Sequence, residues 1–484
     1  MTSSHPSDAE REAVLALLKR HGTHATSFQI LESGIEYWWP TAFEEADAVI
    51  AFCRVRGYRL VVGAPIAAED QMSRVSRQFI AESQADGGRV IFFCVEQDLV
   101  DALAGESCDV VPIGVQGEIA PATYDLNVRS RRSLRSQVRR AVNKSVEVRC
   151  ISPAELAEQS TVLRDQIDSI LQRWLSSRRM AIMRFMVDLQ PFTFPTERRY
   201  FIAEQHGRPV GFLAAVPVYR RAGWFFEDVI RVPDAPNGTV ELLIHTALSH
   251  AVEQGDQYVT MGLSPLAMLD QFHGSSPFYE RLFRFAYDHS RTFYQFSGVH
   301  RFKSRFRPNH WEPQYLIVAP GKLNVSALVG IASAFTGGHF GRFAMNSINR
   351  VIGRLPRQWL SNVVGGLGVF LIPWTILLSL ADGIKWFGSS NAHTAWVVFD
   401  TLMTFALLVT AWMLRHDRPY TRLILKGLSL AFLADFALTT GQVVQLHLGT
   451  RGWDWFWISA GIIGPLLVAV LLGVLGYADR SENA

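Results

Sequence analysis

The chain has 484 residues, of which 49% are hydrophobic and 19% charged, with a formal net charge of +3. This length allows two or three domains, and so small a net charge points by itself to no particular partner. The first ten residues contain neither a basic stretch nor an apolar core, so we expect no signal peptide. The cysteines have no C-x-x-C spacing, which excludes a zinc ribbon and favours a reduced compartment: Cys53, Cys94, Cys108 and Cys150.

The first part of the chain, residues 1–125, has the mixed pattern of an α/β domain. Short apolar runs that alternate with polar residues predict strands, and longer runs with helical spacing predict helices. We expect helices over 8–20 and 69–84, a hairpin formed by 25–31 and 34–39, and further strands over 48–54, 58–63 and 89–95.

A strongly basic helix follows, with seven cations and no acid in 16 residues: Arg129, Arg131, Arg132, Arg135, Arg139, Arg140 and Lys144. Such a concentration of positive charge favours contact with phosphates, either of RNA or of an anionic lipid. The alternative is a solvated helix whose charge is balanced by acids elsewhere. We take Arg132, Arg135, Arg139 and Arg140 as candidate contacts to tRNA or to another phosphate.

The second part, residues 126–320, repeats the α/β pattern. The expected elements are a helix over 153–176, strands over 200–204, 209–218 and 223–232, a helix over 238–254 and a strand over 258–262. Strand, strand, strand, turn, helix, strand is the core order of the GNAT acyltransferase fold. In that fold, two strands splay apart and the following helix N-terminus receives the acyl donor.

Charged residues lie at the end of the third of these strands. Asp228 and Arg231 come just before the turn Pro236-Asn237-Gly238, and Glu241 lies in the first turn of the next helix. The backbone N–H groups of Gly238 and Thr239 would form an anion cradle at the helix N-terminus. The alternatives are structural: an Asp228–Arg231 ion pair, and a Glu241 carboxylate that favours the helix dipole.

The last part of the chain reads as a membrane domain. An amphipathic linker over 321–357 leads to a domain over 358–484, whose four apolar segments each match the roughly 20 residues that cross a bilayer: 360–381, 395–414, 423–446 and 455–477. Arginines cluster before the first segment and between the second and third. This asymmetry predicts an inner (plasma) membrane protein with both termini, and the soluble part, in the cytoplasm.

Three motifs carry a resemblance to a known family: residues 227–243, residues 261–266 and residues 293–315. In this order and spacing they resemble the phosphatidylglycerol lysyltransferases, and more closely the cytosolic catalytic domain of the multiple peptide resistance factor. The resemblance covers roughly residues 15–320. It implies two GNAT-like units in tandem, so we expect an α/β fold with a tandem GNAT-like domain followed by four transmembrane helices.

The resemblance also implies an activity. Members of this family move an aminoacyl group from aminoacyl-tRNA to a lipid hydroxyl, usually that of phosphatidylglycerol, and the reaction needs no metal or other cofactor. Asp228 and Arg231 match the family's Asp-x-x-Arg pair, and Lys303 matches a basic residue of the motif; these three are the expected catalytic residues. The expected substrate-binding residues are Asn237, Gly238, Thr239, Glu241, Arg301 and Glu312.

One departure from the family pattern limits what the resemblance implies. In the lysyltransferases the membrane domain precedes the catalytic domain and includes a flippase, whereas here a short four-span domain follows it. We therefore expect neither lipid flipping nor a fixed acceptor. Two other classes stay open. One is an acyl-CoA- or acyl-carrier-dependent acyltransferase, although the coenzyme A-binding signature Arg/Gln-x-x-Gly-x-Gly/Ala is absent. The other is a non-catalytic protein that binds anionic lipid.

Overall fold

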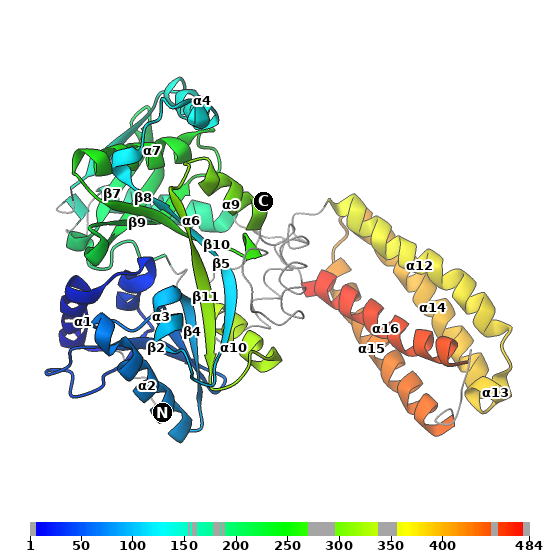
Figure 1. Cartoon of the computed structure of the whole chain (residues 1–484). Helices are drawn as coiled ribbons and strands as arrows, with labels where there is room; N and C mark the ends of the chain where they lie inside the picture. The colour runs from blue at the N-terminus through cyan, green and yellow to red at the C-terminus, as the bar shows by residue number, and fades with distance from the viewer. Residues whose placement is uncertain are drawn as a thin grey trace. The chain divides into compact units, whose positions relative to one another are not determined.

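The computed structural model describes residues 6–152, 155–156, 162–177, 185, 189–269, 296–336, 356–446 and 454–477. The chain divides into two compact units (Figure 1). A soluble unit contains residues 1–178 and 182–340, and a membrane unit contains 179–181 and 341–484. Both expected α/β parts thus lie in one compact unit, and each unit is described separately below.

The soluble unit is built on one sheet of 11 strands in the order β1-β2-β3-β4-β11-β5-β10-β9-β8-β7-β6. Only β3–β4 and β9–β10 pair in parallel; the other neighbours are antiparallel. The strands are β1 Glu36–Trp38, β2 Ile50–Val55, β3 Tyr58–Val62, β4 Arg89–Val95, β5 Asp109–Ile119, β6 Val146–Ile151, β7 Arg199–Gln205, β8 Arg208–Val218, β9 Gly223–Arg231, β10 Tyr258–Pro265 and β11 His310–Ala319.

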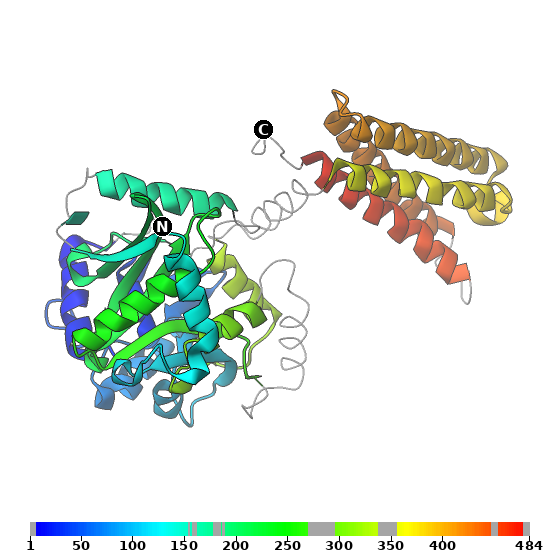
Figure 2. The same ribbon diagram turned by 90° about the horizontal axis from the view of Figure 1, so that it is seen from above.

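Helices cover both faces of this sheet. They are α1 Asp8–His21, α2 Met72–Ala85, α3 Gln97–Ala102, α4 Arg132–Val142, α6 Val162–Ser177, α7 Thr239–Glu253, α9 Phe296–Ser304 and α10 Val325–Phe335. In the second half α6 lies on one face of β8 and β9, whereas α4 and α7 lie on the other (Figure 2). Separate apolar cores fill the two faces, so β7–β9 are buried on both sides.

The element order of the first half recurs in the second. The series β2, β3, α2, β4, α3, β5 matches β8, β9, α7, β10, α9, β11, with the parallel pair at the same place in each series. The last strand of each series is exchanged, because β11 pairs with β4 and β5 pairs with β10. Two similar units joined by strand exchange agree with the expected tandem GNAT-like fold.

One predicted strand is wrong. Residues Ala25–Leu31 form a 3-10 helix in which every residue is buried, rather than the first strand of a hairpin. A short run buried on all sides has no period, so its pattern does not separate strand from helix. The strands β5, β6 and β11 were not predicted; in β5 seven consecutive residues from Val111 to Gly117 are buried, which removes the alternation that reveals a strand.

The first part of the expected linker belongs to the soluble unit. Helix α10 packs on β2 and β3, and Leu323 and Ala327 enter the same apolar core as those strands. A hydrogen bond of 2.9 Å from Arg56 Nε to Ser333 Oγ ties the helix in place. Residues 337–355 lie outside the described residues, so the rest of the expected linker stays a prediction.

Among its described residues, the membrane unit contains four helices long and apolar enough to cross a bilayer, as the sequence predicts. They are α12 Arg357–Ser379, α14 Ser390–Arg415, α15 Thr421–Leu446 and α16 Asp454–Tyr477, with the short α13 Gly383–Phe387 after the first. Leucine, valine and alanine side chains fill the space between them. Two acids inside the spans, Asp400 and Asp435, are buried in the bundle, and Thr439 Oγ1 donates a 3.0 Å hydrogen bond to Asp435.

Candidate active site

The three motifs meet where β9 and β10 separate. These parallel strands pair only from Gly223–Tyr258 to Phe225–Thr260. Beyond this point β9 continues to Arg231 paired only with β8, and β10 pairs only with β5. The first motif forms the end of β9 and the start of α7, the second forms the end of β10, and the third forms α9 and half of β11. Residues 293–295 of the third motif lie outside the described residues.

Lys303 extends from α9 to the part of β10 that no longer pairs with β9. Its Nζ donates hydrogen bonds to the carbonyls of Gly262, at 2.9 Å, and Leu263, at 2.7 Å. These carbonyls are available because the β10–β5 register shifts between Thr260 and Leu263. Lys303 is 9% exposed, and burial lowers the pKa of its ammonium to about 7. Near neutral pH this side chain can therefore both give and accept a proton.

Asp228 lies on β9, beyond its pairing with β10, and is 6% exposed. A β-bulge precedes it, because Ala214 pairs with Asp228 while Ala215 pairs with Phe226. The extra residue is Glu227, and a bulge turns such a residue away from regular alternation. Glu227 thereby reaches Arg198 on the same face, with Arg198 Nη1 donating to Glu227 Oε2 at 2.5 Å.

This Glu227–Arg198 ion pair was missed by the sequence reasoning. Arg198 is 1% exposed and lies over the ring of Phe28, 5.1 Å from its centroid. Burial disfavours its charge, but Glu227, Tyr200 and Asp228 together outweigh burial and raise the pKa of Arg198 above its ordinary value. The Glu-Asp dipeptide was visible in the motif, but strand alternation predicts opposite faces for the two acids, and only the bulge brings both to one face.

Arg231 does not form the expected pair with Asp228. The two residues are three apart on a regular part of β9, so their side chains leave opposite faces of the sheet. Arg231 Nη1 instead donates to the carbonyls of the following turn, those of Val232, Pro233 and Ala235, at 3.1–3.3 Å. Arg231 therefore holds this turn in place.

The start of α7 does not form the expected anion cradle. The N–H of Thr239 donates to Pro236 O at 3.2 Å, and Thr239 is fully buried. Gly238 has φ +98°, and a Cβ at this position would lie 2.0 Å from the carbonyl oxygen of Gln137 in α4. A carbonyl oxygen this close repels an anion, so packing against α4 takes the place of anion binding. Asn237 is exposed beside them.

The remaining candidate binding residues are spread over α7, α9 and β11. Glu241 accepts a 3.2 Å hydrogen bond from Arg305 and so ties α7 to the segment after α9. Arg301 is exposed on α9, and Glu312 contacts His310 at 3.0 Å. The structure therefore brings Asp228 and Lys303 to the two separating strands. Glu241, Arg301 and Glu312 lie on α7, α9 and β11 instead. Within the described residues, no group of three or more His, Cys, Asp or Glu side chains is placed to hold a metal ion.

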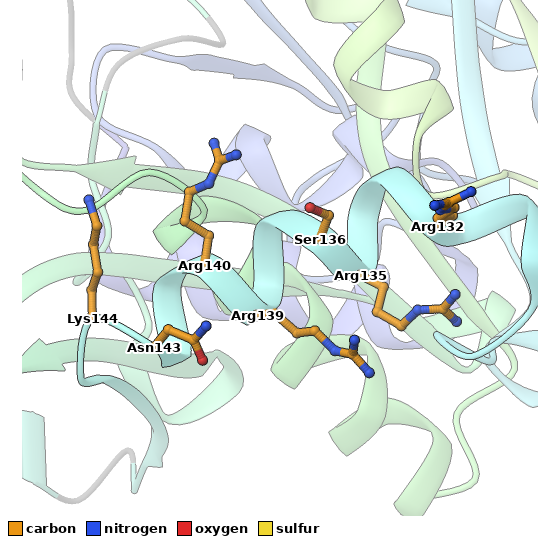
Figure 3. Close-up of a pocket in the computed structure, with 7 residues that line it drawn as sticks. All are labelled: Arg132, Arg135, Ser136, Arg139, Arg140, Asn143 and Lys144. Carbon is orange, nitrogen blue, oxygen red and sulfur yellow. The ribbon is translucent and has the colours of Figure 1, made fainter.

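The predicted basic helix is α4, and its outer face is a cationic groove of about 680 Å³. Figure 3 shows Arg135 and Arg139 extending to one side of the helix and Arg140 to the other; the groove is lined by Arg132, Arg135, Ser136, Arg139, Arg140, Asn143 and Lys144. None of its cations forms an ion pair with a described residue. Arg135 also donates to Asn127 O at 2.7 Å. Arg131, by contrast, is buried and bonds the carbonyls of Asp125 and Phe306.

Residues 15–318 match the family model described as "Phosphatidylglycerol lysyltransferase, C-terminal". The chain belongs to this family. Curated relatives named phosphatidylglycerol lysyltransferase include one from Bacillus subtilis, 22% identical over 64% of this chain and 35% of its own length, and one from Staphylococcus aureus, 23% identical over 57% of this chain and 32% of its own. The chain thus spans about a third of these relatives.

Solved structures show the same fold. L-PGS from Bacillus licheniformis is 21% identical, with a TM-score of 0.57 over 68% of this chain and 96% of that one. The C-terminal DUF2156 domain of a protein from Agrobacterium fabrum named for lysylphosphatidylglycerol synthesis is 18% identical, with a TM-score of 0.58 over 68% of this chain and 98% of that one. The family and the GNAT-like fold class expected from the sequence are therefore confirmed.

Proposed function

We propose that the soluble unit transfers an aminoacyl group from aminoacyl-tRNA to a hydroxyl of phosphatidylglycerol or a similar glycerolipid. The observation that carries this proposal is Lys303, a buried amine with a pKa of about 7 held at the separating strands β9 and β10. A buried group whose pKa is shifted into the neutral range is typical of acid–base sites. The names of the curated relatives support the choice of a lipid acceptor and an aminoacyl group.

The reaction is an ester exchange. The lipid hydroxyl oxygen attacks the carbonyl carbon of the aminoacyl ester, the bond from that carbon to the ribose oxygen breaks, and the hydroxyl proton leaves for the ribose oxygen by way of protein groups. Asp228 orients the incoming hydroxyl. The Lys303 ammonium stabilises the oxyanion of the tetrahedral intermediate and gives a proton to the departing ribose oxygen; the proton released by the attacking hydroxyl then restores the ammonium.

The surroundings of the site suit both substrates. The cationic groove of α4 would hold tRNA phosphates, because a cluster of arginines without acid partners among the described residues binds polyanions strongly. The four spanning helices would keep the enzyme at the bilayer that contains its acceptor. Arginines before α12 and between α14 and α15 support an orientation in which the soluble unit lies on the cytoplasmic side of the plasma membrane, where charged tRNA is found.

A transfer assay tests this proposal. The full chain is reconstituted in vesicles that contain phosphatidylglycerol and supplied with a set of tRNAs charged with labelled amino acids. We expect label in the lipid phase for at least one amino acid, and its loss when the tRNA is first digested with ribonuclease. Label taken from an acyl-CoA, with none from any aminoacyl-tRNA, would instead establish an acyl-CoA-dependent enzyme.

A further inference from the structure

The Glu227–Arg198 ion pair has two unused hydrogen-bonding atoms. Within the described residues, neither Glu227 Oε1 nor Arg198 Nη2 has a hydrogen-bond partner, although both atoms are buried. The side chains are 8% and 0% exposed. Buried polar atoms are almost always paired, because an unpaired one loses its bonds to water without replacement. One acceptor and one donor, adjacent and both unsatisfied, therefore point to a ligand.

The position of the pair connects it with the site. Glu227 is the bulge residue next to Asp228, and Arg198 is close enough to Asp228 for that carboxylate to raise its pKa. Without the bulge, Glu227 would leave the other face of the sheet. The Nε of Arg198 donates to Thr193 O at 2.7 Å, and Nη1 donates to Glu227, so the guanidinium is fixed with Nη2 left over.

The chemistry of the two atoms selects the ligand class. A carboxylate oxygen accepts a hydrogen bond, most strongly from a cation, and a guanidinium N–H donates to an oxygen. An α-amino acid ester carries an ammonium and a carbonyl oxygen on neighbouring carbon atoms. A fatty or acetyl ester has the carbonyl but no ammonium, and it would leave Glu227 Oε1 unsatisfied.

We propose that Glu227 and Arg198 bind the aminoacyl end of the donor, with Glu227 Oε1 accepting from the α-ammonium and Arg198 Nη2 donating to the ester carbonyl oxygen. This inference rests on the proposed function and assigns the residues that recognise the aminoacyl group of its donor. Glu227 is then the residue that distinguishes aminoacyl from other acyl groups. Because the α-ammonium is common to all aminoacyl donors, this contact selects the class and not the individual amino acid.

The test compares donors that differ in one atom. The α-amino group of the charged tRNA is converted to a hydroxyl with nitrous acid, and transfer to lipid is measured with both donors. We expect the wild type to prefer the amino form by at least about tenfold in kcat/KM, the effect of one charge-assisted hydrogen bond, and Glu227→Gln to lose that preference. Glu147→Gln, an exposed acid on β6, is the matched control and should keep it.

Two further arms keep the inference separable from the function. Binding of alanine methyl ester and methyl lactate to the full chain in detergent, measured by saturation-transfer NMR, does not require turnover; we again expect a preference of about tenfold that Glu227→Gln removes. If Glu227→Gln does not fold, the neutral double variant Arg198→Gln/Glu227→Gln replaces it. An unchanged preference in a folded variant, or equal binding of both esters by the wild type, overturns the inference. If the preference is unchanged in a folded variant but aminoacyl transfer to lipid continues, the inference fails and the proposed function stands.

Discussion

The two halves of the soluble unit have the same element order but differ at their parallel strand pair. In the first half, β3 and β4 pair from Tyr58–Arg89 to Val62–Phe93, and every residue of β3 is buried. In the second half, β9 and β10 pair only as far as Phe225–Thr260; beyond this point β9 carries Asp228, and Lys303 bonds two carbonyls of β10. One half is thus closed by strand pairing, and the other is open.

This difference shows how one fold supplies both a support and a site. A continuous parallel pair satisfies its own backbone groups and leaves nothing for a ligand. Separated strands leave backbone carbonyls and strand-end side chains that must find other partners, such as those that Lys303 bonds. We therefore place the chemistry in the second half and treat the first half as its support.

The largest expected effect comes from removing the charges at the open end. Lys303→Met and Asp228→Asn should each lower kcat for aminoacyl transfer by about 10²–10³-fold, because the oxyanion and the attacking hydroxyl lose their partners. Initial rates at saturating tRNA measure this. The control is Lys322→Met, an exposed lysine before α10, which should transfer at the wild-type rate. Near-normal rates from both site variants would show that neither Lys303 nor Asp228 takes part in catalysis.

The pH dependence should identify the protonated form of Lys303 as the active one. Its pKa is lowered to about 7, so the ammonium is present below this pH and is lost above it. We expect kcat to fall with rising pH from about 7, approaching tenfold per unit, and to show no such fall in Lys303→Met. Spontaneous hydrolysis of the aminoacyl ester is subtracted at each pH. A wild-type rate that rises across this range would make Lys303 a base instead.

The cations of α4 should affect binding rather than chemistry. The triple variant Arg132→Gln/Arg139→Gln/Arg140→Gln should raise KM for aminoacyl-tRNA and leave kcat close to wild type. It should also lower the slope of log KM against log salt by about 1 for each phosphate that the variant no longer binds. Arg135 is left in place because it also holds Asn127 O. Three exposed arginines elsewhere, Arg20, Arg74 and Arg208, form the matched triple control. Equal salt slopes in the two triples would argue against a tRNA surface on α4.

The smallest expected effect on chemistry is at Gly238. A Cβ there would lie 2.0 Å from Gln137 O, and the φ of +98° disfavours any other residue, so Gly238→Ala should lower the free energy of unfolding by about 1–3 kcal/mol. Thermal unfolding of the full chain measures this. Because the turn packs against α4 and holds no anion, kcat of the folded fraction should stay within a few-fold of wild type. A variant that is stable but inactive would instead support the hypothesis that this turn binds an anion.

The sequence predicted the class of fold and one part of the site well. Four long apolar segments were recognisable from their length alone. The order of strands and helices in the second half was recognisable from apolar runs of strand or helix length that turn residues separate. The strand β5 was missed because its buried residues from Val111 to Gly117 include proline, glycine and glutamine and so form no continuous apolar run. Ala25–Leu31 was assigned to a strand because a short run that is buried on all sides has no period. The strand exchange between the halves leaves no local pattern at all.

Within the site, the sequence identified residues but not how they are grouped. Asp228 and Arg231 are neighbours in the motif, yet strand alternation separates their side chains, and Arg231 bonds its own turn. Glu227 was passed over because a bulge cannot be read from the residues that form it. Lys303 was recognised by the motif, but its burial and its low pKa depend on the separation of β9 and β10.

The most direct test of the account is lipid mass spectrometry of cells that express the wild type or Asp228→Asn, with membrane levels of both proteins matched. We predict a new lipid in the wild-type cells that is heavier than a cellular glycerolipid by one amino-acid residue, and its absence from the Asp228→Asn cells. The mass difference would name the amino acid and its acceptor. The same new lipid at equal level in both cells would contradict a transferase site at the open end of β9 and β10.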